Sequence, residues 1–198
     1  QDLAPIAPPR ERTISLAAGS RRLADVELAR ADLVIPLFRG NVRRLAQDFD
    51  AVVIDTPPAL GLRMSAALIA GHAVVCPIEL EEYSIDGVAD MLRTVFGVRR
   101  RYNPQLRMAA IVLNRFNPHS LRQKAAMQDL ALNFREFVIP ARISTRSAIP
   151  EALAAGVPVW RLPKSAAREA SLEVRRVFEL LQQRIDGSNA SMPSDTPA

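Results

Sequence analysis

The residues best placed to do chemistry follow apolar runs that are typical of buried strands. Asp55 ends the run that begins at Ala51, and an acidic residue in this position can help to hold Mg²⁺, often through water. The other interpretation is that Asp55 simply caps the next turn. The residues Thr56–Gly61 include paired prolines and end in a glycine, so we expect a loop that could swing as a switch.

Asn114 is a second candidate, because it follows the apolar run Met108–Leu113. Its amide offers a donor and an acceptor, which can pair with the edge of an adenine base. Asparagine is equally at home in a turn after a strand, so the residues alone leave both interpretations open. Two histidines and the lone Cys76 do not make a convincing metal site, and no disulfide can form within the chain.

The elements that must position these side chains alternate between strand and helix. Strands are expected at 13–18, 51–55, 73–78, 108–113 and 137–139, and helices at 23–31, 38–47, 65–70, 84–101, 120–134, 147–155 and 165–185. This order predicts an α/β fold with a mainly parallel sheet flanked by helices. Ligands of such sheets bind beyond the carboxyl ends of the strands.

The ends of the chain have a different composition from its middle. Residues 1–12 are rich in proline and arginine, and we expect a linker or loop there. Residues 13–185 are predicted to form one domain, and the polar residues 186–198 a disordered tail. Because the sequence starts with Gln1 and not methionine, we expect it to begin inside a longer reading frame.

The charge and cysteine content narrow the possible partners and the compartment. The 26 Lys and Arg residues outnumber the 21 Asp and Glu residues in a chain of 198, which gives a net charge of +5. A basic surplus favours a phosphate-rich partner such as nucleic acid or an anionic membrane. No apolar run reaches the ~18 residues of a membrane span, and a single cysteine is typical of the cytoplasm.

The segment Phe49–Gly61 closely resembles the D-x-x-x-I-D-T-P-P-x-L-G segment of ParA-type partition ATPases. The resemblance extends from about Thr13 to Ile185. Shorter matches follow in the family's order at 77–79, 83–84, 87, 103–104, 111–116, 139–142, 156–159 and 164–168. The first block is specific, whereas the later ones carry weight through their order.

The resemblance implies a deviant P-loop ATPase that forms a homodimer around ATP and Mg²⁺ as a full-length protein. It implies that Asp55 lies near Mg²⁺ and the attacking water, with Thr56 and Pro57 beside the nucleotide. It also implies an adenine pocket that is formed by Asn114, Pro140 and Arg142.

The same family binds DNA without sequence preference and works with a ParB-type partner to separate plasmids or chromosomes. By resemblance, we expect DNA contacts at Arg135, Arg161 and Lys164, although any one of them is also explained as an ordinary surface charge. The expected location is the cytoplasm, on the nucleoid and not on a membrane.

One departure from the family bears directly on catalysis. None of the eight glycines lies in a phosphate-binding loop such as the family's K-G-G-V-G-K-T, whose amides and lysine hold the phosphates. The family's acidic D-x-D-P-Q strand is not found either. We therefore expect a P-loop NTPase-like fold that lacks its first strand and P-loop, and no ATP hydrolysis by this chain alone.

Two other functions remain open. A chain without the phosphate loop could be a non-catalytic DNA- or partner-binding module. A MinD-like membrane-associated ATPase would end in a basic amphipathic helix, but the apolar stripe of the predicted helix 165–185 is more typical of packing on a sheet. The polar tail after that helix is not suited to insertion into a membrane.

Overall fold

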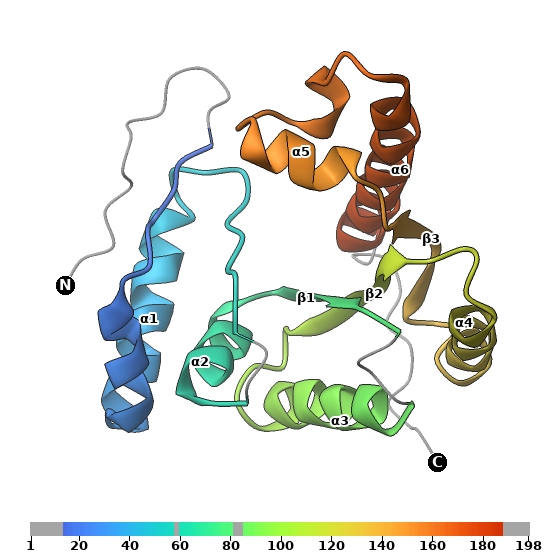
Figure 1. Ribbon diagram of the computed structural model, residues 1–198. Helices are drawn as coiled ribbons and strands as arrows, with labels where there is room; N and C mark the ends of the chain where they lie inside the picture. The colour runs from blue at the N-terminus through green and yellow to red at the C-terminus, as the bar shows by residue number, and fades with distance from the viewer. Residues whose placement is uncertain (1–13, 58–59, 81–84, 188–198) are drawn as a thin grey trace. The chain divides into compact units, whose positions relative to one another are not determined.

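The computed structural model describes residues 14–57, 60–80 and 85–187 (Figure 1). The predicted linker at 1–12 lies outside these residues, as does the predicted tail from 188 onwards. Of that tail, Asp186 and Gly187 are described and belong to a helix. The chain divides into two compact units, 1–72 with 96–106 and 73–95 with 107–198, and we describe each unit by itself.

The first unit is helical. It contains a 3-10 helix η1 (Arg21–Leu28), α1 (Ala31–Leu45) and α2 (Leu62–Ala70). The predicted helices at 38–47 and 65–70 are thereby confirmed, although both begin earlier than expected. The end of α2 is held by the buried Asn103, whose amide donates to the carbonyls of Leu68 and Gly71 at 2.9 and 2.7 Å.

The predicted strands at 13–18 and 51–55 are wrong for every residue that the structure describes there. Residues 14–18 and 51–55 form neither strand nor helix, and Val53 is 93% exposed. A strand needs a neighbour that pairs with its N–H and C=O groups. No described strand pairs with 51–55, so apolarity alone does not make this segment part of a sheet.

The second unit contains a parallel three-stranded sheet in the order β1-β2-β3. The strands are β1 (Ala73–Ile78), β2 (Arg107–Phe116) and β3 (Val138–Ser144), and they confirm the predicted α/β fold class. The strand predicted at 108–113 continues to Phe116. The sequence predicted Asn114 just beyond the strand, whereas the structure places it within β2.

Helices follow each of these strands. They are α3 (Ile85–Arg101), α4 (Leu121–Asn133), α5 (Ala148–Ala154), the 3-10 helix η2 (Val159–Arg161) and α6 (Ser165–Gly187). The predicted helices at 84–101, 120–134, 147–155 and 165–185 are confirmed within the described residues, with ends that differ by up to two residues. The start of α4 shows why: the hydroxyl of Ser120 accepts from the amide of Gln123 at 3.2 Å and caps the helix.

Helix α6 packs on β3 and β2, as Figure 1 shows. Val177 is buried against Ala110, Val112 and Ile139, and further apolar side chains of α6 surround this cluster. The sheet-packing interpretation of the last helix is thereby supported over the membrane one. Among the described helices, none combines the length and apolar character that crossing a membrane requires.

Candidate nucleotide and DNA sites

The carboxyl ends of β2 and β3 form the first candidate site. Leu113 pairs with Arg142 across the two strands, so Asn114 and Arg142 lie at the same end of neighbouring strands. The Arg142 guanidinium lies 4.5 Å from the centre of the buried Phe116 ring. A planar cation over an aromatic ring is a surface on which another flat, electron-rich group can stack.

The predicted adenine contacts differ in the face of the sheet that they use. Pro140 and Arg142 are two residues apart on β3 and share one face, because side chains alternate along a strand. Asn114 is in phase with Ala110 and Val112, which pack with α6. The structure therefore brings Pro140 and Arg142 together and places Asn114 on the neighbouring strand, at the same end of the sheet.

The Asn114 amide is available for a ligand. The residue is half-buried, and within 14–57, 60–80 and 85–187 its side chain has no hydrogen-bond partner. The next residue, Arg115, has a φ of +50°, which is rare for a residue other than glycine. The hydroxyl of Thr145 holds this conformation by donating to the Arg115 carbonyl at 2.9 Å, and strained backbone of this kind gathers at functional sites.

The residues that follow Arg115 are also held in place. The Thr145 amide donates to the Phe116 carbonyl at 3.0 Å, and the Asn117 amide donates to the Gln123 side-chain oxygen at 2.7 Å. The Arg115 guanidinium lies 3.7 Å from Glu79 but is 68% exposed, so this ion pair adds little. Hydrogen bonds to Thr145 and Gln123 thus hold the backbone at the end of β2.

Sequence reasoning missed the network that fastens this end of the sheet to α6. The Glu173 carboxylate accepts from the amide and the hydroxyl of Ser144, both at 2.9 Å, and from Arg146 at 2.9 Å. Burial raises the pKa of Glu173, but the hydrogen bonds from Arg146 and Ser144 outweigh that effect and lower it. No local pattern points to this network, because Glu173 lies 29 residues from Ser144.

Asp55, the predicted Mg²⁺ ligand, belongs to the first unit. Asp55 and Thr56 are exposed and Pro57 is half-buried. The described residues contain no cluster of three His, Cys, Asp or Glu that could hold a metal by itself. A lone carboxylate is still compatible with Mg²⁺, which proteins usually bind through one or two carboxylates together with substrate phosphates.

The predicted DNA contacts lie in two places in the second unit. Arg161 and Lys164 stand just before α6, whereas Arg135 precedes β3 next to Glu136, whose carbonyl accepts from Arg184 near the end of α6. The two ends of this helix are about 30 Å apart, at about 1.5 Å per residue. Arg135 is therefore not part of one patch with the other two.

The surface at the start of α6 is basic. Lys164 forms an ion pair with Glu151 at 2.6 Å while its side chain stays 60% exposed. Arg175 lies 5.4 Å from the ring of Trp160. A shallow depression is lined by Lys164, Arg168 and Arg175 together with Trp160. Cationic groups therefore gather next to the predicted DNA contacts Arg161 and Lys164.

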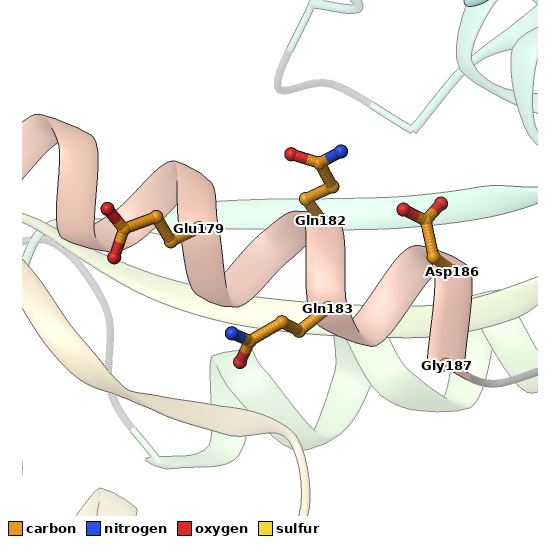
Figure 2. Close-up of a pocket in the computed structure, with 5 residues that line it drawn as sticks. All are labelled: Glu179, Gln182, Gln183, Asp186 and Gly187. Atoms are coloured by element: carbon orange, nitrogen blue, oxygen red, sulfur yellow. The ribbon is translucent and has the colours of Figure 1, made fainter.

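A second depression lies on the carboxyl-terminal half of α6. Figure 2 shows that its lining side chains come from this one helix, with Gln182 and Gln183 on opposite sides. Its other lining residues are Glu179, Asp186 and Gly187. None of the predicted site residues is among them, and the charges are acidic, so this depression contributes neither to the nucleotide site nor to the basic surface.

Comparison with known sequences shows that the chain is similar to partition proteins. A family model described as an AAA domain matches residues 11–108. Protein IncC of Escherichia coli is 37% identical over 87% of this chain and 48% of its own length. The chromosome-partitioning ATPase Soj of Thermus thermophilus is 31% identical over 82% of the chain and 62% of its own length. The chain thus spans about half the length of the IncC relative.

Solved structures of other proteins are similar to this chain as well. Cobyrinic acid a,c-diamide synthase of Mycobacterium smegmatis, with bound ADP and magnesium, has a TM-score of 0.67 at 26% identity and covers 93% of this chain and 67% of its own. The cell division ATPase MinD of Pyrococcus furiosus has a TM-score of 0.54 at 23% identity, over 77% of this chain and 58% of its own, which shows a shared fold. The resemblance to ParA-type partition ATPases is thereby confirmed: the chain is related to them over most of its length, and it shares a fold with MinD.

Proposed function

We propose that this protein is a partition ATPase, which binds ATP with Mg²⁺, dimerises around it, and separates plasmids or chromosomes together with a ParB-type partner. The observation that carries the proposal is the likeness to partition proteins over most of the chain. The site at the ends of β2 and β3 supports it. The open Asn114 amide and the Arg142–Phe116 stack suit the edge and the face of an adenine.

Within this proposal each group of residues has its own task. Asn114, Pro140 and Arg142 would contact the base, while Asp55 would hold Mg²⁺ together with the phosphates. Thr56 and Pro57 would begin the loop that responds to the γ-phosphate. Bound ATP with Mg²⁺ would supply the phosphoryl chemistry. Since the chain contains no G-x-x-x-x-G-K-[ST] sequence, we expect no hydrolysis by this chain alone.

We also propose that the protein binds DNA on the nucleoid without sequence preference, and not a membrane. Arg161 and Lys164 would contact phosphates at the start of α6, and Arg135 would make a separate contact at the other end of that helix. Exposed cations of this kind release counterions from DNA on binding, so the affinity must fall as the salt concentration rises.

Anisotropy of a labelled duplex of random sequence, titrated at two salt concentrations, tests the DNA proposal. The double variant Arg161→Gln, Lys164→Gln should bind more weakly and lower the slope of log K against log salt by about 2, that is about 1 for each lost phosphate contact. Arg135→Gln should lower it by about 1. The control Arg21→Gln, Arg22→Gln removes the same charge from the exposed helix η1 and should keep the slope. An affinity that does not depend on the salt concentration would contradict the DNA proposal.

A non-catalytic DNA- or partner-binding module is the second candidate, favoured by the absence of a phosphate-loop sequence from these 198 residues. The two candidates differ in their response to nucleotide. A partition ATPase should change its DNA affinity when ATP and Mg²⁺ are added, whereas a simple binding module should show one DNA affinity with and without them.

A further inference from the structure

The carboxylate of Glu27 holds the start of α2. One of its oxygens accepts from the Leu62 amide at 2.6 Å, and the other accepts from the Arg63 Nε at 2.7 Å and from the Arg63 amide at 3.4 Å. These amides have no partner within the helix, because the first N–H groups of any helix are unpaired. Glu27 therefore caps α2 from a helix that lies 35 residues earlier in the sequence.

Gly61 shows how closely Glu27 fits against this turn. Its φ of −156° and ψ of −172° are extended backbone that any residue adopts, so the conformation itself does not require glycine. A Cβ atom on Gly61 would however lie 2.5 Å from the nearer Glu27 oxygen. Space for the Glu27 carboxylate is therefore the reason that this structure offers for a glycine at position 61.

We propose that Glu27 is a positioning residue, which fixes the far end of the loop that follows Asp55. The loop begins at Thr56 and ends at Gly61, where Glu27 binds the first turn of α2. With Gly61 and the first turn of α2 held, a movement that begins at Asp55 cannot pass into α2 without breaking the hydrogen bonds to Glu27. This inference rests on the proposed function in one respect only, namely that the loop is the part that responds to nucleotide.

We refer to Glu27 with Gly61, Leu62 and Arg63 as the Glu27 latch. Its geometry predicts how substitutions of Gly61 and Glu27 combine. Gly61→Ala should displace the carboxylate, which is the end of a flexible side chain, and so break the bond to the Leu62 amide. In a Glu27→Ala background the same substitution has nothing left to displace. Gly61→Ala should therefore act only when Glu27 is present.

Hydrogen exchange at single amides of the ¹⁵N-labelled chain, without nucleotide, measures the latch. Glu27→Gln and Gly61→Ala should each speed exchange at the Leu62 amide about five- to tenfold, as expected for loss of a charged helix cap. Asp25→Asn is the matched control, since Asp25 is exposed on the same 3-10 helix, and it should leave that rate unchanged. An unchanged rate in both latch variants, or an effect of Gly61→Ala that persists in Glu27→Ala, would overturn the proposal.

A second arm separates the latch from the proposed function. Addition of ATP and Mg²⁺ should change the exchange of the Thr56 and Leu60 amides while the Leu62 amide keeps its protection. If the exchange of Thr56 and Leu60 does not respond, the switch role of the loop fails while the latch stands on the first arm. If Leu62 loses its protection together with the loop, Glu27 does not fix the loop's end and the inference is wrong.

Discussion

At the scale of single residues, the carboxyl ends of β2 and β3 are held by hydrogen bonds from other parts of the second unit. At the end of β2, a strained Arg115 and a buried Phe116 are both held by Thr145. Glu173 ties the end of β3 to α6 through Ser144. A base would meet a preformed surface here, which lowers the entropic cost of binding.

Substitution of Glu173 tests how much this fastening contributes. Because its folded pKa is lowered below the ordinary 4.5, its stabilisation is present in full above the unfolded pKa and is lost as the pH falls through the lowered value. Glu173→Gln should reduce the free energy of unfolding by about 1–3 kcal/mol at pH 7, and the difference from wild type should shrink below pH 4.5. Urea unfolding across pH 3–7 measures it. The exposed Glu136→Gln is the control, and a difference independent of pH would contradict the assignment.

At the scale of elements, α6 is the part that organises the second unit. Its first turns pack against α5 and η2 through Ala167 and Ala170, and its later turns cover the sheet through Val177. Near its end, the Arg184 guanidinium donates to the carbonyls of Ala109, Glu136, Phe137 and Val138 at 2.8–3.3 Å. The helix is thus held by α5 and η2 near its start and by the sheet over its later turns.

Arg184→Met should therefore destabilise the chain although it adds an apolar side chain. Loss of the Arg184 guanidinium removes charge-assisted hydrogen bonds to backbone oxygens. We therefore expect the free energy of unfolding to fall by about 1–3 kcal/mol. Arg176→Met on the same helix breaks only an exposed pair with Glu179, so it should change the stability by less than about 0.5 kcal/mol. Equal effects of the two substitutions in urea unfolding would show that Arg184 is only a surface charge.

At the scale of the whole molecule, a strand predicted from the sequence is confirmed where the chain also supplies a neighbouring strand that pairs with it. The strands at 73–78 and 108–113 are confirmed because parallel partners in the chain pair with them. The apolar run 51–55 is equally convincing as a sequence, but among the described strands none pairs with it. The alternation of strand and helix was enough for the fold class.

The site residues show a similar limit. Asn114 and Arg142 are predicted as site residues from short local motifs, and the structure places them near the carboxyl ends of two neighbouring strands. The partners that hold such sites could not be named: Glu27 meets Leu62, and Arg184 meets Ala109, across 35 and 75 residues. Single-sequence patterns extend over a few turns of helix or one strand, so contacts of this range have no signature in them.

The central claim is that the ends of β2 and β3 recognise adenine, and an NMR titration of the ¹⁵N-labelled chain with ATP and with GTP tests it most directly. We predict that ATP shifts the side-chain amide of Asn114 and the backbone amides of Phe116 and Arg142, and that GTP does so far more weakly. Asn114→Ala should weaken the response to ATP roughly tenfold, the loss expected for a paired amide–adenine contact, whereas the exposed Asn133→Ala should not. Equal shifts with both nucleotides, or none at these residues, would contradict the account.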